Sequence, residues 1–347
     1  MQPFSVNPQA GPPAHTGPPG APTPPAPPQP PKARRRWFWW GCLPAVVVVL
    51  VVLGVVAALL AYQRDSGVEQ SNGTVLPPNT VTTPVPDSTA VTASCAVQQG
   101  LITRDCAIIT PPDVAAGTKL PVVFLLHGLG DGPVEVRGQG DWANAVVEHR
   151  FMLVTPSGVA NSWNAGGCCG IAKATGIDDV SYLGSLVADI AKRPDVDPKR
   201  IYMAGFSNGG MMVYRFLCVG ADLLAGAASV SGTKAIDCAP KRPIPILHIH
   251  GTGDETVPYR GGAGLVAALL GASFPPVPTM ADGVAEDDGC TAPPTERTDG
   301  DVTTKEWSGC ADGARVELVS IANWPHQWPL SGSLDATTEV LKFFGIV

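Results

Sequence analysis

The chain of 347 residues is long enough for one or two domains, and its composition excludes a protein that is disordered throughout. Hydrophobic residues make up 45% and charged residues 15%, whereas disordered chains are rich in charge and poor in apolar residues. Residues 1–62 hold four basic and no acidic residues, which leaves 19 basic and 30 acidic residues in the remainder. Because nucleic-acid phosphates require a basic surface, this acidic remainder argues against a nucleic-acid partner.

The first 62 residues predict a tail and a membrane anchor. Residues 1–36 are rich in proline, so we expect a disordered tail. Residues 37–62 carry no charge and contain a run of Val, Leu and Ala long enough for one transmembrane helix. Arginines and tryptophans at its start predict a cytoplasmic tail and an extracellular remainder, that is, a single-pass protein of the cell membrane. The alternative is a signal peptide and secretion after cleavage.

Residues 63–93, rich in Thr, Ser and Pro, predict an extracellular linker before a globular domain at 94–347. Eight of the nine cysteines lie beyond the predicted membrane helix. An even number outside the cell predicts disulfides, with Cys95–Cys106 and Cys290–Cys310 plausible as local pairs and the other connectivity open. Cys168 and Cys169 are adjacent, which is not the spacing of zinc ligands.

Strand and helix patterns alternate through the globular part. Strands are expected at 106–110, 120–127, 151–155, 201–206, 227–230 and 244–249, with a late pair at 302–307 and 315–321. Helices are expected at 178–192, 211–218, 263–270 and 334–344. Alternation with unbroken apolar strands predicts an α/β fold, in which helices cover both faces of a mostly parallel sheet.

Ser207 lies in the sequence Gly-Phe-Ser-Asn-Gly between a predicted strand and a predicted helix. This strand-turn-helix context makes the G-x-S-x-G pattern informative, because a sharp turn would expose the serine hydroxyl. The Asn208 amide would then lie at a helix N-terminus, where it could bind developing negative charge. We predict Ser207 as a nucleophile; the alternative is a glycine-rich packing turn.

A nucleophilic serine needs a base, and the base needs a carboxylate to orient it. Asp254 follows the strand at 244–249, and His326 follows the late strand pair. The order Ser207, Asp254, His326 is the order of α/β-hydrolases. Glu255 is the alternative carboxylate. His248 and His250 share a strand face and could bind a metal, but no third ligand has a useful spacing.

The second oxyanion donor is expected in the loop after the strand at 120–127. We predict the Leu129 amide, with Gly128 as the alternative, and interpret His127 as a brace for that loop. Trp163, Trp324 and Trp328 are candidate walls of a substrate cleft, although ordinary packing explains them equally well.

Six separated segments together carry a family resemblance. They start at Leu126, Trp163, Asp178, Ser207, His250 and His326. In this order they resemble the polyhydroxybutyrate depolymerase-like proteins and the feruloyl and acetylxylan esterases of carbohydrate esterase family one, all α/β-hydrolases. The resemblance covers about residues 95–345 and implies a serine ester hydrolase that uses Ser207, Asp254 and His326. It departs before His326, where similar proteins have glycines and this chain has Asn-Trp-Pro.

These observations predict a membrane-anchored extracellular serine esterase that works through an acyl-enzyme and needs no cofactor or metal. Its expected substrate is a polyester, a feruloylated or acetylated polysaccharide, or a small ester. The alternatives are an acyltransferase with the same residues, a peptidase, and an inactive cell-surface binding module.

Overall fold

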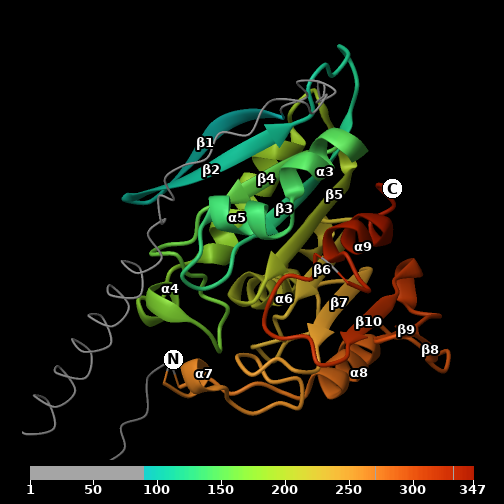
Figure 1. Ribbon diagram of the computed structural model, residues 1–347. Coiled ribbons are helices and arrows are strands. Elements are labelled where there is room, and N and C mark those ends of the chain that lie inside the picture. Colours follow the sequence, from blue (N-terminus) through green and yellow to red (C-terminus); the bar gives the residue numbers. More distant parts are fainter. Residues whose placement is uncertain (1–89, 270, 331) are drawn as a thin grey trace, which may run out of the picture. The chain divides into compact units, whose positions relative to one another are not determined.

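A computed structural model describes residues 90–347, except residues 270 and 331 (Figure 1). The predicted tail and transmembrane helix, and the linker up to residue 89, lie outside these described residues. Within the described part, no helix has the length and apolarity needed to cross a bilayer. The first described strand begins at Val91, inside the segment predicted as linker.

Ten strands form one mixed sheet. They are β1 Val91–Gln99, β2 Ile102–Thr110, β3 Leu120–Leu126, β4 Met152–Pro156, β5 Val196–Phe206, β6 Gly226–Val230, β7 Ile246–Gly251, β8 Thr295–Asp299, β9 Val302–Trp307 and β10 Val316–Ile321. Their order is β1-β2-β4-β3-β5-β6-β7-β10-β9-β8. The strands from β4 to β10 in this order are parallel, as predicted, whereas antiparallel pairs extend the sheet at both edges (Figure 1).

Helices cover both faces of the sheet, as the sequence predicts. They are α2 Pro133–Gln139, α3 Trp142–His149, α4 Gly170–Ala174, α5 Asp179–Ala191, α6 Asn208–Gly220, α7 Leu265–Leu269, α8 Val277–Asp287 and α9 Ala336–Phe343. Strand β3 shows how the two cores arise, because its side chains alternate between faces. Val122 and Phe124 pack in a core with α5, α6 and α8, and Val123 and Leu125 pack in a second core with α2, α3 and α9.

Every strand and helix predicted in the globular part is present, with shifts of a few residues at the ends. Strands β1 and β8 were not predicted. Strand β8 is exposed along its whole length and β1 along much of it, so neither has the apolar alternation that marks a half-buried strand. Helices α2, α3, α4 and α8 were also not predicted.

Four disulfides occur among the described residues. The two pairs favoured by proximity, Cys95–Cys106 and Cys290–Cys310, are both present. The first joins paired residues of β1 and β2. The other two disulfides are Cys168–Cys169 and Cys218–Cys238.

Candidate active site

Ser207 occupies a strained turn between β5 and α6. Its φ is +52°, a backbone conformation that residues other than glycine rarely adopt. Both flanking positions have room only for glycine. A Cβ on Gly205 would lie 2.4 Å from the Gly209 carbonyl carbon, and a Cβ on Gly209 would lie 2.3 Å from the Leu126 oxygen. The strand-turn-helix context predicted for Ser207 is therefore present, and its glycines are required by backbone packing.

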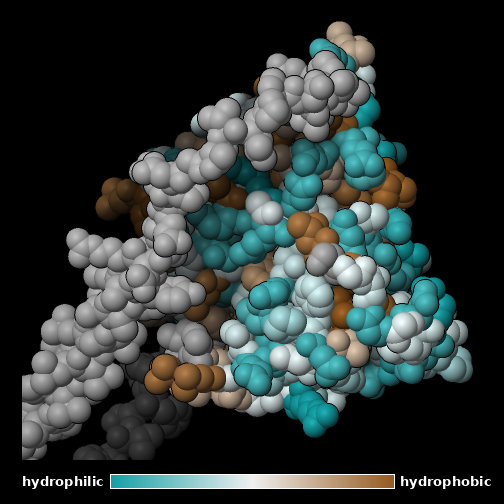
Figure 2. Space-filling model, in the orientation of Figure 1, coloured by the Kyte–Doolittle hydropathy of each residue, from teal (hydrophilic) through white to brown (hydrophobic). Residues whose placement is uncertain are grey.

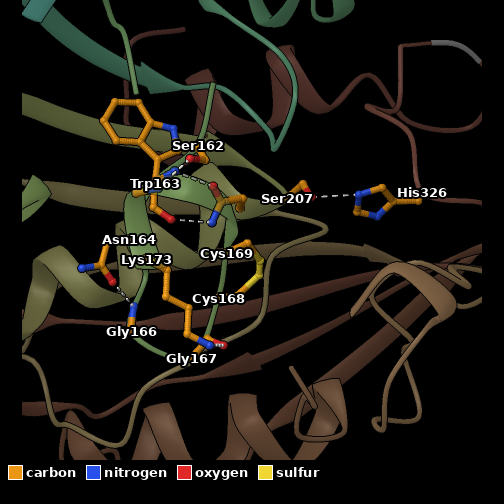
Figure 3. The surroundings of a disulfide bond; sticks show 12 residues. Ser162, Trp163, Asn164, Gly166, Gly167, Cys168, Cys169, Lys173, Ser207 and His326 are labelled. Atoms are coloured by element: carbon orange, nitrogen blue, oxygen red, sulfur yellow. Dashed lines mark hydrogen bonds between the residues drawn. A yellow bond between two sulfur atoms is a disulfide. The ribbon is translucent and has the colours of Figure 1, made fainter. Parts of the chain in front are cut away.

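The structure brings Ser207, His326 and Asp254 together. His326 Nε2 is 2.9 Å from Ser207 Oγ (Figure 3). His326 Nδ1 is 2.6 Å from Asp254 Oδ2. The three residues follow β5, β10 and β7, which are parallel, so their carboxyl ends meet at one edge of the sheet. In this arrangement the histidine can take the serine proton while the carboxylate stabilises the imidazolium.

Asp254 is held as a carboxylate by donors on both oxygens. Its Oδ1 accepts from the Thr256 and Val257 amides at 2.9 and 2.8 Å, and its Oδ2 faces His326 and, at 3.3 Å, His250 Nε2. Burial opposes the charge, but these hydrogen bonds outweigh it and lower the pKa of Asp254. The alternative carboxylate, Glu255, has an exposed side chain.

A cavity of about 250 Å³ opens beside Ser207 and His326. Its remaining lining is mainly apolar: Gly128, Leu129, Asp131, Cys168, Cys169, Phe206, Asn208, Met211, Thr256, Val257, Ala267 and Phe274. The two predicted oxyanion residues, Leu129 and Asn208, are thus both at the cavity, as is the alternative Gly128. Helix α7 contributes Ala267 and carries two exposed leucines, and Figure 2 shows hydrophobic surface at its position.

The Cys168–Cys169 disulfide forms part of the cavity wall, a role that the sequence did not indicate. Figure 3 shows it beside Ser207. The loop that carries it also holds Asn208: the Trp163 amide donates to Asn208 Oδ1 at 2.7 Å, and Asn208 Nδ2 donates to the Trp163 carbonyl at 3.0 Å. The unusual cysteine pair was the available signal, but only the fold shows that it lies at the site.

The three tryptophans predicted as cleft walls are not among the residues that line this cavity. Trp163 is fully buried, and its Nε1 donates to the His127 carbonyl. Trp328 is buried against Phe206 and Trp142, and Trp324 donates to the Gln327 carbonyl. Packing and loop hydrogen bonds account for these contacts, and a part for the tryptophans in a wider substrate cleft stays a prediction.

The other buried histidines have partners in the protein. His127 Nε2 accepts from the Gly158 amide and its Nδ1 donates to the Gly128 carbonyl, as expected of a brace for the oxyanion loop. Burial lowers the pKa of His127, so it is neutral. His248 and His250 contact each other, and no cluster of three or more metal-binding side chains occurs in the described part of the chain.

The sheet order and the turn at Ser207 are those of the α/β-hydrolase fold. A family model described as phospholipase/carboxylesterase matches residues 172–273. The acetyl xylan esterase structure from Aspergillus awamori superposes with a TM-score of 0.52 at 14% identity, covering 74% of this chain and all of that one, which supports the fold alone.

Several curated relatives are named as esterases. Feruloyl esterase B of Piromyces equi is 35% identical over 185 residues, which is 51% of this chain and 33% of the relative. A bifunctional acetylxylan esterase/xylanase of Neocallimastix patriciarum is 28% identical over 160 residues, which is 45% of this chain and 22% of the relative. The chain thus spans a third or less of these proteins. The matches confirm the predicted resemblance to feruloyl and acetylxylan esterases and support a carboxylic ester hydrolase.

Proposed function

We propose that this protein is a serine carboxylic-ester hydrolase. Its proposed substrate is an ester of the kind cleaved by feruloyl esterases, acetylxylan esterases or polyhydroxybutyrate depolymerases. The observation that carries the proposal is the hydrogen-bonded series from Ser207 through His326 to Asp254 at the edge of an apolar cavity. The names of the curated relatives support the same reaction class.

The mechanism is a two-step acyl transfer. His326 takes the Ser207 proton as Oγ attacks the ester carbonyl, and Asp254 stabilises the imidazolium that forms. The Asn208 and Leu129 amides hold the oxyanion, each contributing about 10²–10³ in turnover. The imidazolium then protonates the leaving alcohol, and water activated by His326 hydrolyses the acyl-enzyme. No step calls for a group beyond the chain's own residues and water.

The cavity favours an apolar acyl group. Met211, Phe274 and the Cys168–Cys169 disulfide present carbon and sulfur surface next to Ser207. Sulfur and aromatic groups attract each other, so an aromatic acyl group such as a ferulate fits this lining as well as a short aliphatic one. The charged or hydrogen-bonding parts of a polysaccharide would then remain at the mouth of the cavity.

The full-length protein, purified in detergent, should be tested on p-nitrophenyl acetate, butyrate and octanoate, methyl ferulate and a hydroxybutyrate oligomer. We expect hydrolysis that Ser207→Ala reduces about 10⁴-fold or more, and labelling of Ser207 by a fluorophosphonate. Ser185→Ala, on the exposed face of α5, is the matched control. Products formed with an added acceptor alcohol would identify an acyltransferase, and folded protein without labelling or turnover would refute the proposal.

We further propose that residues 37–62 anchor the protein in the cell membrane with residues 94–347 outside. The support is the uncharged apolar segment with arginines and tryptophans at its start. In intact cells, external protease should remove a C-terminal tag and spare an N-terminal tag. Release of the domain into the medium without its N-terminal tag would instead indicate a cleaved signal peptide.

A further inference from the structure

Behind Asp254 lies a buried series of three side chains that the proposed mechanism does not use. Tyr214 Oη is 3.0 Å from His248 Nδ1, and His248 Nε2 is 3.0 Å from His250 Nδ1. His250 Nε2 lies 2.9 Å from the Val257 carbonyl oxygen and 3.3 Å from Asp254 Oδ2. Tyr214 lies on α6 and the histidines on one face of β7, and all three are almost completely buried.

The acceptors fix the direction of these hydrogen bonds. A carbonyl oxygen can only accept, so His250 Nε2 carries a proton and donates toward Val257 and Asp254. His250 then accepts at Nδ1 from His248 Nε2, and His248 accepts at Nδ1 from the Tyr214 hydroxyl. The reverse direction would make Tyr214 an acceptor and leave its proton with no acceptor in the part of the chain that the structure describes.

Burial supports this assignment. Burial and the neighbouring His250 hold the pKa of His248 well below its ordinary value, so its ring is neutral. Burial and the charge of Asp288 raise the pKa of Tyr214, so its hydroxyl keeps its proton. The titratable groups that face the series are Asp254 and His326 at one end, Asp288 at the other, and Tyr259, whose ring lies edge-on to His250.

We propose that Tyr214, His248 and His250 are positioning residues that orient the Asp254 carboxylate toward His326. His250 acts by two routes. It donates weakly to the same oxygen that contacts His326, and it holds the carbonyl of Val257, whose amide donates to the other carboxylate oxygen. Tyr214 and His248 act by fixing the His250 tautomer. The inference rests on the proposed function, in that Asp254 orients the base that activates Ser207.

The tautomers can be read in the unmodified protein. In full-length protein labelled with ¹⁵N-histidine, we expect both His248 and His250 to carry a proton at Nε2 and none at Nδ1. A proton at Nδ1 of either ring would overturn the proposal, with no dependence on any variant or on the identity of the ester.

Variants test whether the series acts on the site or only on stability. His250→Phe removes the donor, and we expect it to lower kcat and the rate of fluorophosphonate labelling about 10- to 100-fold per folded molecule, as for loss of a hydrogen bond to a charged group. KM should change less than about threefold. His250→Gln, which retains an N–H donor, should recover part of the loss. The acid limb of the pH profile should move to higher pH in His250→Phe, because the Asp254 carboxylate then loses one of its donors and its charge acts more strongly on His326.

Tyr214→Phe keeps the ring and removes only the hydroxyl that donates to His248. This variant therefore tests the proposal if the His250 variants do not fold. We expect a two- to fivefold loss of labelling rate, whereas Tyr182→Phe, which removes another buried hydroxyl that donates to the Asp105 carbonyl, should have none. Equal effects of Tyr214→Phe and Tyr182→Phe, or a folded His250→Phe with wild-type labelling, would overturn the proposal. If the variants change the labelling rate as expected but the protein hydrolyses no ester, the proposed function is refuted and the positioning role of the series stands.

Discussion

Asp288 is the buried carboxyl group whose ionisation should control how stability depends on pH. Its side chain is fully buried after α8; Oδ2 accepts from the Ile244 amide at 3.5 Å, and Oδ1 has no partner among the described residues. Burial raises the pKa of Asp288 to about 7, and that hydrogen bond offsets the effect only in part. The folded protein therefore favours the protonated carboxyl.

The direction of the pH effect follows from linkage. An unfolded aspartate has a pKa of about 3.9, so the stabilising contribution of protonated Asp288 is complete below that pH and is lost as pH rises through about 7. We expect the urea midpoint to fall between about pH 5 and pH 8, and Asp288→Asn to remove most of the fall. A smaller fall should persist, because burial also raises the pKa of Glu317. Equal slopes in wild type and variant would contradict this prediction.

At the scale of elements, the loop from Ser162 to Gly170 links the shape of the cavity to the position of Asn208. It places the Cys168–Cys169 disulfide in the cavity wall and forms two hydrogen bonds with the Asn208 side chain. Lys173 Nζ of α4 donates a hydrogen bond to its Gly167 carbonyl at 2.8 Å. A change in the disulfide should therefore alter the fit of the acyl group more than the chemistry at Ser207.

This expectation is testable with the double variant Cys168→Ser/Cys169→Ser. We expect KM for butyrate, octanoate and ferulate esters to rise about three- to tenfold, because the wall loses apolar sulfur surface and rigidity. Acetate hydrolysis and fluorophosphonate labelling should change less than about threefold. Cys218→Ser/Cys238→Ser, which removes a disulfide outside the cavity lining, is the matched control. The same KM profile in both variants would show a general effect of losing a cross-link.

At the scale of the whole described unit, a buried ion pair joins the antiparallel edge of the sheet to the site. Arg104 Nη2 of β2 lies 2.8 Å from Asp179 Oδ1 of α5, and the two side chains are 2% and 0% exposed. Asp179 Oδ2 also accepts from the Asn164 amide, in the loop from Ser162 to Gly170, at 2.7 Å. The antiparallel edge of the sheet is thereby connected to the segment that holds Asn208.

Loss of one partner should be costly because it leaves a buried charge uncompensated. We expect Arg104→Met to lower the free energy of unfolding by about 3–5 kcal/mol, measured by urea denaturation. The double variant Arg104→Met/Asp179→Leu should lose less than Arg104→Met alone. Lys192→Ala, which breaks an exposed pair with Asp189, should cost at most about 1 kcal/mol. An Arg104→Met cost as small as this control would show that the pair has no structural role.

Much of the site could be predicted because its signals are local. Ser207 lies in a short motif between a strand and a helix, and Asp254 and His326 follow strands that the apolar pattern identifies. The helix at 178–192 was also predictable from its first residues: Asp178 accepts from the Ser181 amide as an N-cap. The late strand pair was also predictable from a local signal, because both strands have partly alternating patterns of apolar and polar residues.

The sequence by itself determined the α/β class, the turn at Ser207 and the two local disulfides, because each shows in patterns of residues close together in the chain. Tertiary structure decided the antiparallel edges of the sheet, the cavity wall, the burial of Trp163 and Trp328, and the Tyr214–His248–His250 series. These features join residues far apart in sequence, such as Arg104 with Asp179 or Tyr214 with His248. Which of many polar or aromatic side chains meet in such contacts depends on the packing of whole elements, and local patterns do not encode it.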